Sequence, residues 1–153
     1  IAIAPTKNIS RFEWFLEKAT EIGIDEITPI ICQRSERKKI NIDRCKRILV
    51  SSIKQSLKYH LPTLNEPIDF NDFVKQTFEG DKFIAHCLKK DKIKLDKSIK
   101  NRCTVLIGPE GDFTENEINH ALDKNFKATA LGNSRLRTET AGIIATHSVN
   151  LQF

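Results

Sequence analysis

The stretch TVLIGPEGDFTENEI, residues 104–118, holds an apolar run, a glycine-containing turn and the start of a helix. Residues 104–107 are typical of a buried β-strand. Thr114 and Glu117 have the spacing of a capping box, in which each side chain accepts a hydrogen bond from the other residue's backbone N–H. A helix is therefore predicted to begin at Thr114. This order of strand, loop and helix predicts one βα unit of an α/β domain.

Similar units occur along the rest of the chain. A second capping box is predicted at Ser10 and Glu13, and residues 62–67 and 89–102 are expected to be a loop and a solvated connection. Strands are predicted at 1–4, 27–31, 82–87, 104–107 and 127–131, and helices at 10–23, 42–57, 70–78, 114–122 and 138–151. Strands that alternate with helices favour a mostly parallel sheet with helices on both faces.

The bulk composition is that of one globular domain: 153 residues, 39% hydrophobic and 29% charged. No apolar stretch reaches the ~20 residues of a membrane helix, and no signal-peptide pattern opens the chain. The four cysteines form no CxxC pair, so we expect reduced thiols in the cytoplasm and no metal site. The chain has no methionine, and we therefore expect it to be part of a longer protein.

Charge is segregated along the sequence. Residues 34–58 carry nine Lys or Arg against two acidic residues, whereas residues 103–153 carry four against six. Segregation of this kind predicts a polyanionic partner, of which nucleic acid is the commonest. The alternative is a solvated helix face without a partner.

Two loops, residues 108–113 and 132–139, follow predicted strands and precede predicted helices. Both should lie at the carboxyl edge of the sheet, where α/β proteins bind ligands. Gly108 and Gly111 allow close approach of the backbone, and the helix N-termini offer free N–H groups, which suit a small polar ligand with an adenine or a ribose. A purely structural tight turn would also explain the glycines. Neither GxGxxG nor GxxxxGK[ST] is present, which disfavours an ordinary dinucleotide fold and a P-loop.

Arg137 and Glu139 lie where a buried helix should begin. Charges at such a place must be paired or functional. The alternative to a functional role is a structural pair between these two side chains that caps the helix.

The pair LIGPEGDFTENEI (106–118) and LGNSRLRTETAGIIA (131–145) resembles the RsmE family, the 16S ribosomal RNA uridine-N3 methyltransferases of the SPOUT superfamily. FEWFLEKATEIGIDEITPIICQRS (12–35) and SSIKQSLKYHLPTL (51–64) extend the resemblance, which covers nearly the whole chain. It implies an α/β fold with a deep C-terminal trefoil knot, S-adenosylmethionine as cofactor, and a homodimer. It also implies that residues 1–153 are a catalytic domain without the family's N-terminal RNA-binding β-barrel.

The resemblance also assigns cofactor-binding residues. Ala85, His86 and Cys87 match a third cofactor-facing segment, for which a core or surface histidine is the alternative. Two departures stand out: many relatives have a second glycine where this chain has Asp112, and an arginine where it has Ser134. The residues expected to bind the cofactor are Ile107, Gly108, Pro109, Glu110, Gly111, Leu131, Gly132, Leu136, Arg137, Thr138, Thr140, Ala141 and His86.

The implied reaction is methylation of uridine N3 in the RNA of the small ribosomal subunit. Arg137 would stabilise the negative charge on the uracil carbonyls, and Glu139, or alternatively Glu110, would act as the base. Two rivals remain: a non-catalytic RNA-binding module, and an enzyme that binds nucleotides or phosphates, which the acidic loop residues oppose. Another SPOUT enzyme with a different RNA target is a further alternative. The residues expected to bind RNA are Arg34, Arg37, Lys38, Lys39 and Arg135, the last as a substitute for the family arginine.

Overall fold

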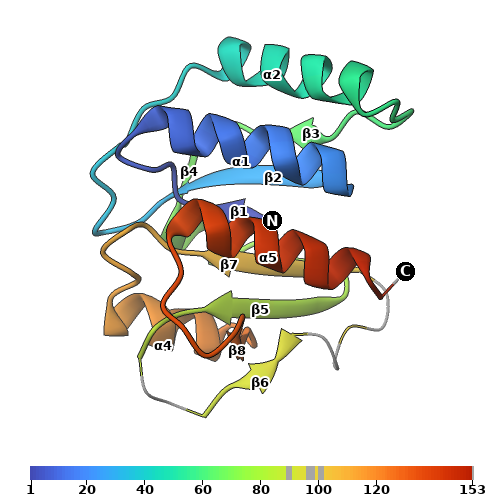
Figure 1. Cartoon of the computed structure of the whole chain (residues 1–153). Helices are drawn as coiled ribbons and strands as arrows, with labels where there is room; N and C mark the ends of the chain where they lie inside the picture. Colours follow the sequence, from blue (N-terminus) through green and yellow to red (C-terminus); the bar gives the residue numbers. More distant parts are fainter. Residues whose placement is uncertain (89–90, 96–98, 100–101, 153) are drawn as a thin grey trace.

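A parallel β-sheet forms the middle layer of the domain (Figure 1). The computed structural model describes residues 1–88, 91–95, 99 and 102–152. Every strand pair in this described part is parallel, as predicted. The strands are β1 (Ala2–Ile3), β2 (Glu26–Ile31), β3 (Thr63–Leu64), β4 (Ile68–Asp69), β5 (Asp81–Ala85), β6 (Ile93–Lys94), β7 (Cys103–Ile107) and β8 (Lys127–Ala130).

The strand order places the first strand of the chain in the interior of the sheet. The order is β3-β2-β1-β7-β5-β8-β6, and β4 pairs with the carboxyl end of β2. Ala2 in β1 is in register with Thr28 of β2 on one side and with Leu106 of β7 on the other. Because the strands are parallel, their carboxyl ends meet at one edge, and both loops singled out from the sequence follow strands at that edge.

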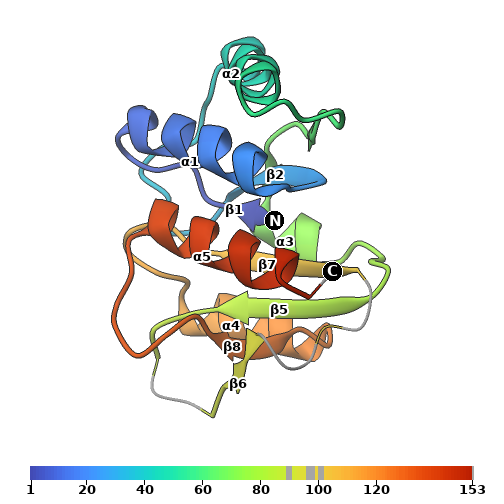
Figure 2. The ribbon, with the colours of Figure 1, turned by 45° about the vertical axis from the view of Figure 1, so that its right-hand side comes forward.

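Helices cover both faces of the sheet, as predicted. α1, α2 and α5 lie on one side, and α3 and α4 lie on the other (Figures 1 and 2). The last helix, α5, packs beside the first, α1. The helices are α1 (Ile9–Ile22), α2 (Ile42–Gln55), α3 (Phe70–Val74), α4 (Glu115–Asp123) and α5 (Thr138–Asn150).

The core has one cluster on each face of the sheet, and successive strand residues alternate between them. In β7, Val105 and Ile107 pack against α1 and α5, whereas Leu106 packs against α3 and α4. Phe83 and Ile84 of β5 divide in the same way. A strand buried on both faces must be apolar at consecutive positions, which explains why the β7 sequence is continuously hydrophobic.

The predicted capping box at the start of α1 is wrong, whereas the one at the start of α4 is present. Asn8 is the N-cap of α1, and its Oδ1 accepts from Ser10 N at 3.1 Å. Glu13 does not reach back to the helix start, because its carboxylate accepts from the Arg44 guanidinium of α2, with Nη2 to Oε2 at 2.9 Å. Because the helix is capped at Asn8, Ser10 lies inside its first turn and Glu13 is too far along the helix to form a capping box.

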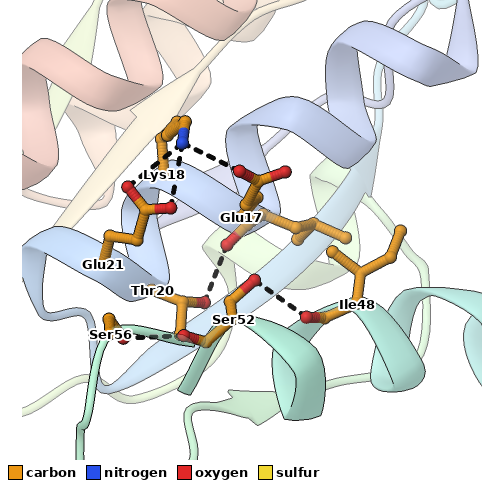
Figure 3. Close-up of polar contacts among 8 residues, drawn as sticks. Glu17, Lys18, Thr20, Glu21, Ile48, Ser52 and Ser56 are labelled. Atoms are coloured by element: carbon orange, nitrogen blue, oxygen red, sulfur yellow. Dashed lines mark hydrogen bonds and ion pairs between the residues drawn. The ribbon is translucent and has the colours of Figure 1, made fainter. Parts of the chain in front are cut away.

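Hydroxyl groups at the contact between α1 and α2 are satisfied within their own helices (Figure 3). The buried Thr20 and Ser52 each donate to the carbonyl four residues earlier, at 2.7 and 2.8 Å, and Ser56 donates to the Ser52 carbonyl. Lys18 pairs with Glu21, three residues along α1, at 2.9 Å. The helices therefore bury small polar side chains without the cost of an unpaired hydroxyl.

The remaining differences concern element ends and short segments: the helix expected over residues 70–78 ends at Val74, and the strand expected over residues 82–87 spans Asp81–Ala85. Residues 62–67 were expected to be a loop, yet β3 begins at Thr63, and β4 follows directly. The connection 89–102 contains β6, although residues 89–90, 96–98 and 100–101 lie outside the described residues. Unlike β1, whose two residues are both buried, β3, β4 and β6 each contain at least one exposed residue, so no apolar run marked them in the sequence.

Candidate functional site

The loop after β7 turns tightly enough to favour glycine as its first residue. A Cβ placed on Gly108 would lie 3.1 Å from the ring of Phe113, which is buried and packs against Phe70. Pro109 is also buried, while Gly111 is exposed. The loop thus folds back on its own phenylalanine, and this anchor presents the exposed backbone near Gly111 at the carboxyl edge.

Asp112 joins this loop to the end of β5. Its backbone has φ 63°, a left-handed conformation that is uncommon for residues other than glycine. One carboxylate oxygen accepts from Phe113 N and the other from Cys87 N, both at 2.8 Å. The aspartate therefore fixes the loop against the segment that contains the buried His86. The sequence marked position 112 as a departure from relatives but did not indicate this contact.

The loop after β8 contacts the loop after β7 through a buried hydrogen bond. Thr138 Oγ1 donates to the carbonyl oxygen of Gly108 at 3.0 Å. Arg135 Nη2 makes a longer contact of 3.4 Å to the Glu110 carbonyl. Gly132, with φ 149°, begins the second loop in open space. The two loops singled out from the sequence are thus brought together at one place.

The two charged residues at the start of α5, Arg137 and Glu139, differ in their exposure to solvent. Arg137 is the exposed N-cap residue. Glu139 is only 7% exposed, and its Oε1 lies 3.8 Å from Nε of Arg11 in α1. Its Oε2 is buried and has no hydrogen-bond partner among the described residues. The partner of Glu139 is therefore Arg11 and not Arg137, which the sequence alternative had proposed.

Glu110, the other candidate base, is half-buried and faces the loop after β1. Its Oε1 accepts from the backbone N–H of Lys7 at 2.9 Å. The Lys7 ammonium itself pairs with Glu36 at 2.7 Å. The ends of β1, β2 and β7 are thus joined by polar contacts around Glu110.

The basic residues after β2 divide into two kinds. Arg34 Nη1 donates to the Gly111 carbonyl at 2.9 Å, and Arg37 donates to the carbonyls of Thr6 and Lys7, at 3.1 and 2.8 Å for its closest contacts. These two guanidinium groups hold neighbouring loops in place. Lys38 and Lys39 are exposed and have no described side-chain partner, so their charge is open to solvent and to a polyanion.

The other predicted cofactor residues also lie around the two loops. Ile107 ends β7 in the core, and Leu131 and Ala141 are partly buried against the cluster that α1 and α5 cover. Leu136 and Thr140 are half-buried. The site thus has apolar walls as well as polar backbone.

All four cysteines are free. Burial raises the pKa of each thiol, that of Cys45 and of Cys103 to about 11. For Cys87 the Asp112 carboxylate raises the pKa further. Thiols with raised pKa values stay protonated at neutral pH, so they are poor nucleophiles. The described residues contain no group of three or more His, Cys, Asp or Glu side chains that could hold a metal ion.

A groove of about 1350 Å³ lies at the opposite, amino edge of the sheet. Its walls include Glu26, Gly80 and Asn150. None of the predicted cofactor residues lines it, so this groove is separate from the two loops. Among the described residues, none of the helices has the length and apolar character needed to cross a membrane.

The fold and the site together define an open-sheet α/β domain with a candidate ligand site at the carboxyl edge, formed by the loops after β5, β7 and β8. Residues 1–150 match the model of the RNA methyltransferase domain family. The chain belongs to this family, and its relatives place it in the RsmE group of SPOUT proteins.

Two relatives are ribosomal RNA small subunit methyltransferases E. The protein of Mesomycoplasma hyopneumoniae is 33% identical over 94% of this chain and 64% of its own length, and that of Rickettsia conorii is 30% identical over 89% and 57%. The chain therefore spans about three fifths of the length of these relatives.

Two solved structures share the fold. A probable rRNA methyltransferase from Porphyromonas gingivalis has a TM-score of 0.92 and 39% identity over 98% of this chain and 65% of its own. A ribosomal RNA small subunit methyltransferase E from Neisseria gonorrhoeae, bound to S-adenosyl methionine, has a TM-score of 0.88 and 25% identity over 99% and 65%. These likenesses confirm the family expected from the paired motifs.

Proposed function

We propose that this domain transfers a methyl group from S-adenosylmethionine to N3 of a uridine in 16S ribosomal RNA. The observation that carries the proposal is the buried bond between Thr138 and Gly108, because it joins the two loops of the family motif into one site. The relatives named as small-subunit methyltransferases, and the Neisseria relative bound to S-adenosyl methionine, support the same reaction.

The residues around the two loops fit such a cofactor. Exposed backbone at Gly111 and Gly132 can approach a ligand closely, and Leu131 and Leu136 offer partly buried apolar surface for an adenine ring. The carboxylate of Glu110 suits a cationic sulfonium better than a phosphate. When bound, the cofactor supplies an electrophilic methyl group.

The task of the protein is then to align the uracil and to stabilise its charge. Removal of the N3 proton leaves an anion that is delocalised onto the uracil carbonyls. Arg137 is exposed at the start of α5 and has no partner among the described residues, so its guanidinium is available to those carbonyls. Because N3 lies on the pairing edge, the uridine must be unpaired when it enters the site.

The base that takes the N3 proton is Glu139, with Glu110 as the alternative. Glu139 is close to Arg137 in the chain and has one carboxylate oxygen without a described partner. Glu110 already accepts from the Lys7 backbone, which occupies one of its oxygens. Each candidate thus has one oxygen engaged and one without a described partner, and it is the position of Glu139 beside Arg137 at the start of α5 that favours it for this role.

The RNA surface is proposed to run from the loops over the segment after β2. Lys38 and Lys39 are its exposed cations, while Arg34 and Arg37 mainly order the loops and Arg135 lies beside the Glu110 carbonyl. The substrate would be the small ribosomal subunit in the cytoplasm. In the parent protein a preceding RNA-binding domain would add affinity.

Two further family properties belong to the proposal. A trefoil knot requires the segment after β8 to pass through a loop of the preceding chain, and the contact of Thr138 with Gly108 is compatible with that path. A homodimer would cover apolar side chains that this chain leaves partly exposed, among them Trp14 of α1, 44% exposed, and Ile144 of α5.

The test is methyl transfer to small ribosomal subunits that lack the modification, with radiolabelled cofactor and mass spectrometry of the nucleosides. We expect label in N3-methyluridine, and we expect Arg137→Ala to lower the rate at saturating cofactor by about 10²- to 10³-fold. Cofactor binding without transfer would instead indicate a binding module. Label in another nucleoside would indicate a different RNA target.

A further inference from the structure

A second cavity at the carboxyl edge is separate from the loops described above. It has a volume of about 510 Å³ and lies between the end of β2, the start of α3 and the first turns of α4. A cavity of this size is large enough for one nucleotide base. The polar side chains in its wall include Gln33, Lys38, Asp69, Asn71, Asn116 and His120.

The carboxylates in the wall are engaged in holding the structure together. Asp69 accepts from Asn71 N at 2.8 Å as the N-cap of α3. Glu117 accepts from Gln33 N and from Thr114 N, both at 2.8 Å. Two negative charges against the single cation in the wall oppose an anion inside the cavity. The cavity therefore favours a neutral polar group over a phosphate.

Neutral amides supply the hydrogen-bonding groups for such a ligand. His120 Nδ1 lies 2.9 Å from Asn71 Oδ1, and because an amide oxygen only accepts, this contact leaves the Asn71 amide N–H groups as donors. Gln33 and Asn116 are exposed in the same wall. Amide side chains carry both a donor and an acceptor, as base edges do, and this match underlies their use in base recognition.

The position of the cavity connects it to the proposed RNA surface. Gln33 precedes Arg34, whose guanidinium holds the Gly111 carbonyl of the cofactor loop. Lys38, at the other end of this short segment, lines the cavity and is exposed. Residues 33–38 therefore contribute Gln33 and Lys38 to the wall of this cavity, and Arg34 to the support of the loop after β7.

We infer that this cavity receives one unstacked base of the substrate RNA, a neighbour of the methylated uridine. Gln33, Asn71 and Asn116 contact the base edge, and Lys38 contacts the adjoining phosphate outside the cavity. The inference rests on the proposed RNA substrate but concerns a different set of residues. It assigns to α3 and α4 a part in choosing the target nucleotide.

The experiment uses unmodified, fluorescently labelled small-subunit ribosomal RNA in a salt titration. For Gln33→Ala/Asn116→Ala we expect RNA affinity to fall on the order of tenfold with an unchanged salt slope, because base contacts release no counterions. For Lys38→Gln we expect the slope to decrease by about 0.7, the value for one phosphate contact on a single strand. Gln76→Ala, an exposed amide at the amino edge, is the matched control and should change neither quantity.

A second arm removes single bases from the RNA around the target uridine. One abasic position should weaken binding to the unaltered protein but not to the double variant, since the lost contacts are the same. Cofactor affinity of the double variant should be unchanged. The inference is overturned by equal RNA affinity of the double variant and the unaltered protein, or by a matched loss of cofactor affinity. If the unaltered protein bound neither cofactor nor RNA, the proposed function itself would fail.

Discussion

The hydrogen bond between Thr138 and Gly108 is the only described side-chain bond from the start of α5 to the loop after β7, and Thr138→Val removes it while nearly preserving the shape of the side chain. Thr138 is 5% exposed, so water cannot replace the lost hydroxyl without rearrangement. The carbonyl of Gly108, also buried, then loses its donor. The substitution therefore tests whether this contact holds the two loops together.

A buried acceptor left without its partner costs about 1–3 kcal/mol. In a chain of this size each kcal/mol lowers the melting temperature by about 2–4 °C, so we expect a decrease between about 2 and 12 °C. If the cleft forms only when both loops are in place, affinity for S-adenosylmethionine should also fall, by about tenfold for each 1.4 kcal/mol that binding must restore. Thermal melting and titration calorimetry measure the two effects.

Thr138→Ser is the matched control, because it keeps the hydroxyl and loses only a methyl group. It should retain cofactor affinity to within a few-fold. If Thr138→Val melted and bound cofactor like the unaltered protein, the contact would contribute nothing to the site. Equal losses in the serine and valine variants would point to packing of the methyl group instead of the hydrogen bond.

Four other predictions follow from the same structure. Gly142→Ala should lower stability by about 1–3 kcal/mol in thermal melts, since a Cβ there would lie 2.6 Å from the Phe15 ring; an unchanged melt would contradict this packing. Asp112→Gly should weaken cofactor binding several-fold in calorimetry, and Asp112→Asn, which tolerates φ 63° and keeps one of the two acceptor oxygens, should restore it in part. Lys38→Glu/Lys39→Glu should flatten the salt dependence of RNA binding, whereas equal slopes would place the RNA elsewhere. Light scattering should give twice the 17.5 kDa of the chain, and a mass near 17.5 kDa at tens of micromolar would exclude the dimer.

Sequence patterns predicted the elements that have a long apolar period or a local cap. The interior strands were visible because burial on both faces demands consecutive apolar residues, as in β7. The cap at Thr114 was predicted correctly because both of its partners lie within four residues. The cap at Ser10 was wrong because the helix is capped earlier, at Asn8, and Glu13 pairs with Arg44, 31 residues away. Local spacing cannot reveal a competing partner in another helix.

The same distinction explains what was missed at the site. Glycines and charges marked the two loops, but the partner of Glu139 is Arg11, far away in the sequence. The bond from Cys87 to Asp112 likewise joins segments that neither period nor motif relates. The unusual residue at position 112 was the one available signal, since an aspartate in a glycine-like conformation needs a compensating contact.

The positive charge of residues 34–58 has a different meaning once the contacts of its arginines are known. Arg34 and Arg37 donate to backbone carbonyls of the loops after β7 and β1, so reversing their charge would disturb the cleft as well as the RNA surface. Cofactor and RNA affinity would then fall together, and the two sites would appear to be one. Lys38 and Lys39 are exposed, and no described contact links their side chains to the loops. Reversing the charge of these two lysines should therefore lower RNA affinity and leave cofactor affinity nearly unchanged, because ordinary salt screens exposed charges beyond about 10 Å.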